Sequence, residues 1–289
     1  MTGSRLPEKQ KTLQHEVFLS GLGLFTGEKC SIKICPAEPN TGIVFQRVDL
    51  PGKPEIPATL TYVKETPRCT RLAREKASIH TVEHLLSALS ALEVDNARIE
   101  VEGPEIPIGD GSSLVFVELI EKAGFKAQEQ ERRCLKITQP LFWTEGEISL
   151  VALPSEHFRI SYTIHYPHSP LIRSQYYSFS LQSDAYKSEI ASCRTFSLYE
   201  EILPLIEKGM IKAGGLENAL VIKGDQVLNP GGARFPDEMV RHKVLDLIGD
   251  LALIGMPLQG HIIAICSGHS SHVAFAKILS KCTNSECRL

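Results

Sequence analysis

The sequence predicts an α+β fold made of two similar domains, each a β-sheet with helices on one face. Three observations support this prediction: a helix–strand–loop–helix pattern occurs twice, strand-like segments precede each occurrence, and a polar segment at residues 128–133 (QEQERR) separates them. We therefore expect one domain at residues 1–128 and a second at residues 134–289, joined by a short linker.

The two occurrences contain the same elements in the same order. The first places a helix, an alternating strand, a Gly/Pro-rich loop and a second helix at residues 81–92, 97–101, 102–113 and 114–123. The second repeats that order at residues 237–253, 261–266, 267–271 and 272–281. Each has the pattern V-x-H near the start of its first helix. A single such echo also arises by chance, so the pattern alone leaves duplication and coincidence equally open.

Short strand-like segments lie upstream of each occurrence. They are found at residues 30–34 and 43–47 in the first half, and at residues 134–138, 148–153 and 158–164 in the second. Residues 199–235 interrupt the second half with a helical part, a glycine break and two short apolar runs, and are interpreted as an insertion. The Gly-rich residues 21–27 lack both a full G-x-G-x-x-G motif and a βαβ context, so they predict a hairpin or tight turn.

Composition limits the class of protein. Hydrophobic residues make up 43% and charged residues 22% of 289 residues, which excludes wholesale disorder. Thirty-one basic and 34 acidic side chains give a net charge of -3, so the composition lacks the excess of basic residues that is typical of nucleic-acid-binding proteins. No apolar run reaches the roughly 18 residues that span a bilayer, and the first residues lack a signal-peptide core. The eight cysteines contain no C-x-x-C pair. We expect reduced thiols and a cytoplasmic location.

The strongest local motif is a set of polar residues on the helix at residues 237–253. His242, Asp246 and Asp250 are spaced at i, i+4 and i+8, so they project from one face, about 6 Å apart along the axis. The rest of that helix is apolar and would bury it. Buried carboxylates are costly unless they bind a cation or each other, so the pattern fits either a metal clip or a structural hydrogen-bonded network.

A second motif begins the helix at residues 81–92. His80 to His84 reads H-x-x-E-H, the inverted zincin pattern, although a five-residue match is weak and a polar helix edge without metal explains it equally well. If both motifs form one site, His84, His242 and Asp246 supply three ligands and leave a fourth position open, as catalytic zinc requires. Glu83 would then be the general base.

Two further segments carry candidate polar groups. His269 follows the strand at residues 261–266 in a Ser/Gly loop, where Asp250 could orient and charge it; a lone loop histidine is otherwise a surface residue. Thr195 could donate a hydrogen bond and Phe196 could stack on a ligand, although their composition also fits a plain strand end.

Taken together, these segments resemble one family, the zinc-dependent UDP-3-O-acyl-N-acetylglucosamine deacetylases (LpxC) of lipid A (lipopolysaccharide) biosynthesis. The matching stretches run in order through nearly the whole chain: GLGLFTG, PNTGIVF, TVEHLLSAL, VDNARIEVEGPEIPIGDGS, SCRTF, RHKVLDLIGDL and SGH. The resemblance implies two β-α-α-β domains with the active site between their helix layers. It also implies hydrolysis of the acetamide of UDP-3-O-(3-hydroxyacyl)-N-acetylglucosamine to amine and acetate, the committed step of that pathway.

The resemblance also implies residue roles. The zinc ligands would be His84, His242 and Asp246, with Glu83 as general base and His269 as the general acid that protonates the departing amine. Asp250 would hold His269, and Lys243 and Thr195 would donate to the tetrahedral intermediate. The substrate-binding residues would be Phe196 on the sugar, Tyr166 on the uracil, and Cys69. Residues 199–235 are similar to the family's insertion, which forms an apolar passage for the acyl chain.

Three positions depart from the family pattern. Phe25 stands where the family usually has His, so a polar role is absent there. His80 stands where the family commonly has Ser, and we expect it to be a bystander. Glu147 stands near a position that is often basic in the family, which puts the phosphate contacts of the nucleotide in question.

The resulting prediction is a cytoplasmic, monomeric zinc deacetylase of a small-molecule acylated UDP-amino sugar, with Fe²⁺ as the competing metal. Three rival functions remain at this point. They are a non-catalytic acyl-nucleotide-binding protein of the same fold, an Fe(II) oxygenase using two His and one carboxylate, and a metalloprotease using His80 and His84.

Overall fold

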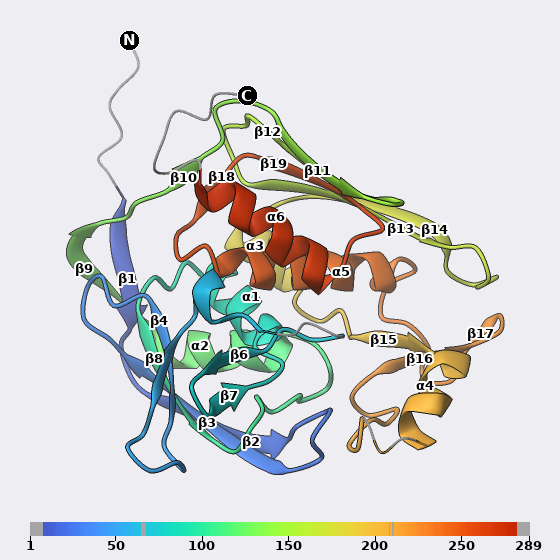
Figure 1. Cartoon of the computed structure of the whole chain (residues 1–289), viewed down its shortest axis with the longest axis horizontal. Helices are drawn as coiled ribbons and strands as arrows, with labels where there is room; N and C mark the ends of the chain where they lie inside the picture. Colours follow the sequence, from blue (N-terminus) through green and yellow to red (C-terminus); the bar gives the residue numbers. More distant parts are fainter. Residues whose placement is uncertain (1–7, 65–67, 208, 210, 282–289) are drawn as a thin grey trace.

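The structure, a computed structural model, describes residues 8–64, 68–207, 209 and 211–281. Two five-stranded sheets form its outer layers, and the main helices lie between them (Figure 1). This arrangement confirms the predicted α+β class with helices on one face of each sheet. Among the described residues, no helix is long and apolar enough to cross a membrane.

The first sheet has the strand order β2-β3-β8-β4-β5. Its strands are β2 (Val17–Leu22), β3 (Lys29–Pro36), β4 (Ile43–Arg47), β5 (Glu55–Pro57) and β8 (Ala97–Glu102). Its inner face packs against α1 (Glu83–Ala91) and α2 (Leu114–Ala123). Alternation explains the burial, because Cys30, Ile32 and Ile34 of β3 point into the core and the residues between them do not.

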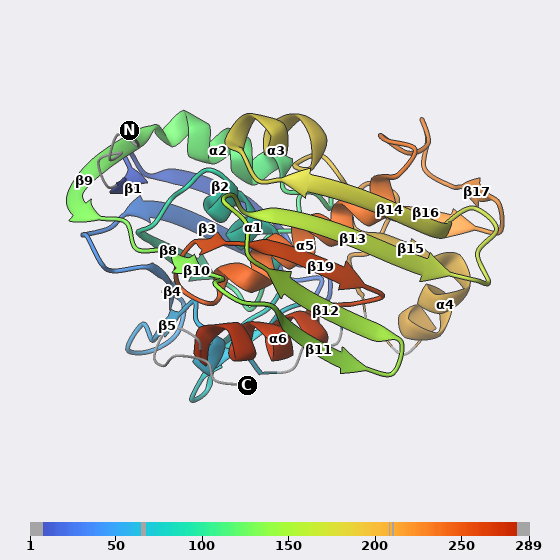
Figure 2. The ribbon, with the colours of Figure 1, turned by 90° about the horizontal axis from the view of Figure 1, so that it is seen from above.

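The second sheet has the order β11-β12-β19-β13-β14 and covers α5 (Glu238–Ala252) and α6 (His269–Lys281), as Figure 2 shows. Its strands are β11 (Leu141–Glu145), β12 (Ile148–Leu153), β13 (Arg159–Tyr166), β14 (Arg173–Ser180) and β19 (His261–Ile265).

The two sheets share one topology. In each, the last strand in sequence occupies the centre, antiparallel to the second strand and parallel to the third. The repeat seen in the sequence pattern is therefore a repeat of the fold.

Smaller elements complete the chain. A two-stranded sheet joins β1 (Lys9–Leu13) to β9 (Phe125–Glu131), and another joins β10 (Leu135–Lys136) to β18 (Leu258–Gln259). The others are the 3-10 helix η1 (Leu60–Tyr62), the hairpin β6 (Leu72–Arg74) and β7 (Ala77–Ile79), and α3 (Ser183–Glu189).

A three-stranded sheet at one end of the molecule joins β15 (Phe196–Leu198), which precedes the insertion, to two strands of the insertion (Figure 1). The elements of the insertion are α4 (Tyr199–Glu207), β16 (Leu220–Lys223) and β17 (Gln226–Val227). The predicted helical part and the two short apolar runs correspond to α4, β16 and β17. The Gly-rich turn at residues 21–27 connects β2 and β3, as predicted.

Three boundaries differ from expectation. Most of the polar segment at residues 128–133 is strand rather than linker, because β9 continues to Glu131 and pairs with β1. Its side chains are mostly exposed, which is why they are polar. The strand expected at residues 134–138 shrinks to Leu135–Lys136. α6 begins at His269, so the loop before it is shorter than predicted.

The two halves meet where α1 packs against α5. A Cβ atom at Gly249 would lie 2.1 Å from the backbone oxygen of Glu83. Only glycine permits this approach, which brings the start of α1 against the polar face of α5.

Candidate active site

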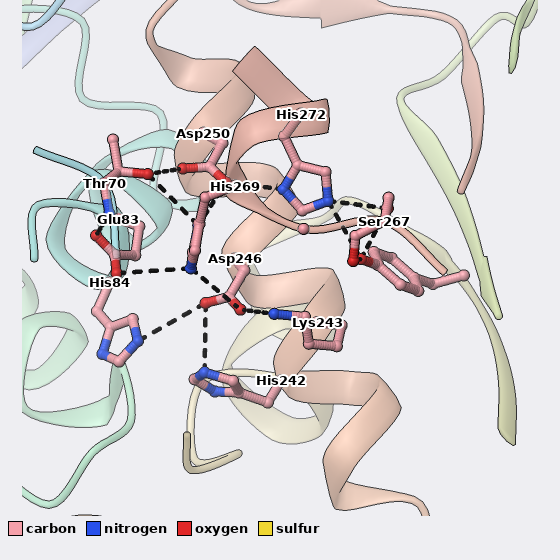
Figure 3. A network of polar contacts seen from close by, with 12 residues as sticks. Thr70, Glu83, His84, His242, Lys243, Asp246, Asp250, Ser267, His269 and His272 are labelled. Atoms are coloured by element: carbon pink, nitrogen blue, oxygen red, sulfur yellow. Dashed lines mark hydrogen bonds and ion pairs between the residues drawn. The ribbon is translucent and has the colours of Figure 1, made fainter. Parts of the chain in front are cut away.

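Three ligand-type side chains from the two helices converge in the interior. His84 comes from the first turn of α1, and His242 and Asp246 lie one turn apart on α5 (Figure 3). Nε2 of His84 is 3.8 Å and Nε2 of His242 is 3.3 Å from Oδ1 of Asp246. All three side chains are buried. The structure thus brings together the residues predicted to bind metal.

The Oδ1 atom of Asp246 is what distinguishes this group. It is buried and has no hydrogen-bond partner among the described residues, although two imidazole nitrogens face it. A buried carboxylate oxygen without a partner is costly, and a cation between it and the two nitrogens would satisfy it. The donor set of two imidazoles and one carboxylate fits a divalent metal.

The protonation states also suit metal binding, which requires neutral imidazole and ionised carboxylate. Burial, reinforced by the charge of His242, lowers the pKa of His84 to about 3. Burial alone would raise the pKa of Asp246, but His242 and Lys243 outweigh it and hold that pKa well below its usual range. Nδ1 of His242 lies 3.0 Å from the carbonyl oxygen of Cys193, an acceptor that turns Nε2 inward.

Glu83 and His269 lie next to each other beside this group (Figure 3). Nε2 of His269 is 3.9 Å from both Oε1 of Glu83 and Oδ2 of Asp246. Burial raises the pKa of Glu83 to about 8, so without a cation nearby this carboxyl group is mostly protonated at neutral pH. Burial would lower the pKa of His269, but Asp250 and then Asp246 reverse this and raise it to about 9. An imidazolium that can donate a proton thus faces a carboxyl group that can accept one once it is ionised.

Asp250 pairs with His269 as predicted. Nδ1 of His269 donates to Oδ2 of Asp250 over 2.8 Å, and His272 makes a matching bond of 2.7 Å to the same oxygen. The ligand-type atoms of these three residues also lie within 4.8 Å of one another, close enough to share a metal ion. Each ring nitrogen facing Asp250 is already bonded to it, so we interpret this second group as a hydrogen-bonded network.

A cavity of about 700 Å³ opens onto these residues. Lys243, Thr195, Phe196 and Tyr166 all line it, with the rings of Tyr166 and Phe196 5.8 Å apart. Lys243 donates to Oδ2 of Asp246 over 2.6 Å. Burial would lower the pKa of Lys243, but Asp246 raises it, so the ammonium is retained.

The insertion gives the cavity an apolar wall. The apolar residues of this wall are Ile202, Ile211, Leu216, Val221 and Leu228 of the insertion, together with Leu198 at the end of β15. Phe25, from the Gly-rich turn, also lines the cavity and adds apolar rather than polar surface. The backbone nitrogen of Ala213 donates to the oxygen of Leu24, which ties that turn to the insertion.

Cys69 is not brought to the cavity with the others. Its side chain is buried and is absent from the cavity lining, although Arg68 beside it belongs to that lining. His80 stays outside the ligand group, where its backbone pairs with that of Glu105. Glu147 does not line the cavity either.

Two residues of the polar network were not predicted. Thr70 Oγ1 donates to Oδ1 of Asp250 over 2.5 Å, and its backbone nitrogen donates to Glu83. His272 lies one turn after His269 on α6, and this i+3 spacing was an available signal. Thr70 comes from a loop near β6, where no spacing rule points to α5.

Three ligand-type residues beside an acid–base pair at the base of a cavity are typical of metal-dependent hydrolases. The chain matches a family model described as LpxC: UDP-3-O-acyl N-acetylglycosamine deacetylase over residues 10–281. It is 49% identical over 273 residues to UDP-3-O-acyl-N-acetylglucosamine deacetylase of Chlamydia pneumoniae, covering 94% of this chain and 97% of the relative. The same-named protein of Chlamydia muridarum is 48% identical over 275 residues, covering 95% and 96%. The chain belongs to the LpxC family.

Proposed function

We propose that this chain is a zinc-dependent deacetylase that removes the N-acetyl group of UDP-3-O-(3-hydroxyacyl)-N-acetylglucosamine and releases acetate. The observation that carries the proposal is the unpartnered Oδ1 of Asp246, which faces two imidazole nitrogens beside Glu83 and His269. The relatives' shared name supplies the substrate.

His84, His242 and Asp246 would hold the Zn²⁺ ion and leave a coordination position open. When bound, the ion would lower the pKa of a coordinated water and polarise the acetamide carbonyl. Fe²⁺ suits the same donors, and metal analysis distinguishes the two ions.

The surrounding residues transfer protons and stabilise the charge that develops during the reaction. Glu83 accepts a proton from the attacking water, and Lys243 and Thr195 donate hydrogen bonds to the oxygen that gains charge. His269 gives its Nε2 proton to the amide nitrogen as the C–N bond breaks. This donation is needed because an amide anion is too poor a leaving group to depart unprotonated.

The cavity wall suggests how the substrate is oriented. The apolar surface of the insertion suits the acyl chain, Phe196 suits the sugar, and Tyr166 suits the uracil ring. Cys69 contributes only by packing in this proposal, since it does not line the cavity. We retain the two units at residues 1–128 and 134–289, and a monomeric cytoplasmic enzyme, as predictions.

Acetate release from the UDP-sugar, measured before and after chelation, tests the proposal. We expect release that stops on chelation and returns with Zn²⁺. Binding without release, unaffected by Glu83→Gln, would instead indicate the non-catalytic binding protein. Consumption of O₂ with 2-oxoglutarate would indicate the oxygenase, and metal loss in His80→Ala would revive the protease.

A further inference from the structure

Two buried residues, Thr70 and His272, hold the Asp250 carboxylate without lining the cavity. Both are 0% exposed. Thr70 Oγ1 donates to Oδ1 of Asp250 over 2.5 Å, and Nδ1 of His272 donates to Oδ2 over 2.7 Å. The bond from His269 also ends on Oδ2. Each oxygen of Asp250 is therefore fixed by a group that cannot touch the substrate.

Thr70 also reaches the opposite side of the site. Its backbone nitrogen donates to Oε2 of Glu83 over 3.0 Å while its hydroxyl donates to Asp250 (Figure 3). Thr70 thus contacts Glu83 directly, and it contacts His269 both through Asp250 and by its own hydroxyl oxygen, which lies 3.4 Å from Nδ1 of His269. The relative position of the proton acceptor and the proton donor depends on it.

His272 is fixed from its other side. Burial lowers its pKa, so its ring is neutral and Nε2 is an acceptor. Oγ of Ser267 lies 3.0 Å and the hydroxyl of Tyr162 lies 3.2 Å from that nitrogen. The Tyr162 hydroxyl in turn donates to the backbone oxygen of Ser267 over 2.7 Å. His272 therefore connects Asp250 to the segment that leads into His269.

We propose that Thr70 and His272 are positioning residues that clamp the Asp250 carboxylate from both sides, so that the His269 ring keeps the orientation needed to protonate the departing amine. This proposal rests on the proposed function of His269. Because neither residue reaches the cavity, their loss should affect the rate of the chemical step and leave substrate binding unchanged.

Matched variants separate positioning from packing. Thr70→Val keeps the side-chain shape and removes the hydroxyl, whereas Thr70→Ser keeps the hydroxyl. His272→Leu removes the Nδ1 donor, whereas His272→Asn keeps a donor near the same place. We expect kcat to fall ~10–100-fold in Thr70→Val and His272→Leu, with KM and zinc content unchanged, and to recover largely in Thr70→Ser and His272→Asn.

Either of two results would overturn the proposal: wild-type kcat in both Thr70→Val and His272→Leu, or an equal loss in each variant and its conservative partner. If His272→Leu does not fold, the isosteric Thr70→Val carries the test.

NMR of histidine-labelled protein detects the hydrogen bonds of His269 and His272 to Asp250 without any substrate. We expect protected Nδ1 protons on His269 and His272, with the His269 signal lost in Thr70→Val and kept in Thr70→Ser. An unchanged His269 signal in Thr70→Val would contradict the clamp. Failure of the wild-type protein to release acetate, with these signals as expected, would refute the proposed function and leave the clamp standing.

Discussion

Burial affects two neighbouring groups differently because their partners differ. Glu83 is 2% exposed and has the carboxylates of Asp246 and Asp250 nearby, so burial dominates and its pKa rises. His269 is similarly buried, but the carboxylate of Asp250 lies 2.8 Å away and reverses the effect of burial. The pKa values of both groups are therefore raised, to about 8 for Glu83 and about 9 for His269.

Replacing His269 tests the acid directly. In His269→Ala we expect kcat to fall ~10²–10⁴-fold, because general acid catalysis contributes about that much. Zinc content should stay unchanged, since the imidazole is outside the ligand set. Steady-state kinetics with metal analysis of the same sample measures both. A variant that turns over at the wild-type rate would remove His269 from the mechanism.

The same pair predicts a bell-shaped dependence of kcat/KM on pH. Glu83 must be deprotonated, so activity rises as pH increases through its pKa; His269 must be protonated, so activity falls as pH increases through its own pKa. These values are about 8 and about 9 without metal. A cation nearby favours carboxylate and disfavours imidazolium, so both limbs should lie lower in the zinc enzyme. Glu83→Gln should abolish the acidic limb; an unchanged limb would assign it elsewhere.

At the scale of elements, the contact between α1 and α5 decides whether the site exists. Glycine at position 249 lets α5 approach the backbone of α1, and this approach brings His84 to Asp246. The helix would otherwise prefer alanine at that position.

The direction in which Gly249→Ala changes the free energy of unfolding therefore tests this close contact. Helix propensity alone would stabilise the variant by ~1 kcal/mol. We expect instead a loss of about 1–3 kcal/mol in the free energy of unfolding, because the added methyl group collides with the backbone oxygen of Glu83. Urea unfolding measures it. A variant more stable than wild type would contradict the close contact.

Sequence reasoning predicted elements with strong periodicity and missed those set by tertiary contacts. The helix at residues 237–253 was predicted to within one residue at each end, since its apolar and polar faces are distinct. β9 was not predicted because an exposed strand carries polar residues and resembles a linker. Thr70 could not be predicted, because its partner Asp250 is 180 positions away and only the packing of the two halves joins them.

At the scale of the whole molecule, the site belongs to both halves of the repeat. His84 and Glu83 come from the helix layer of the first sheet, whereas His242, Asp246 and His269 come from that of the second. The two sheets have the same topology, and their helix layers face one another. The residues on the two facing layers differ, so the first half supplies the base and one metal ligand, and the second half supplies the acid and two metal ligands. The insertion adds an apolar wall to one half only.

A metal held by both halves should link them energetically. Ligand binding to the folded state alone stabilises it by RT ln(1 + [L]/Kd), about 2.7 kcal/mol at a free metal concentration of 100 Kd. We expect chelation to lower Tm of the wild-type protein and Zn²⁺ to restore it. Asp246→Ala should show neither response. If the chelator does not change the Tm of the wild-type protein, the buried group of His84, His242 and Asp246 is structural.

The proposed function requires that His84, His242 and Asp246 hold a metal on which deacetylation depends. Metal content and acetate release measured on one sample, for wild type and Asp246→Ala, test it most directly. We expect one zinc ion per wild-type chain with acetate released, and loss of both in the variant. Stoichiometric zinc in Asp246→Ala, or acetate release by metal-free wild-type protein, would contradict it.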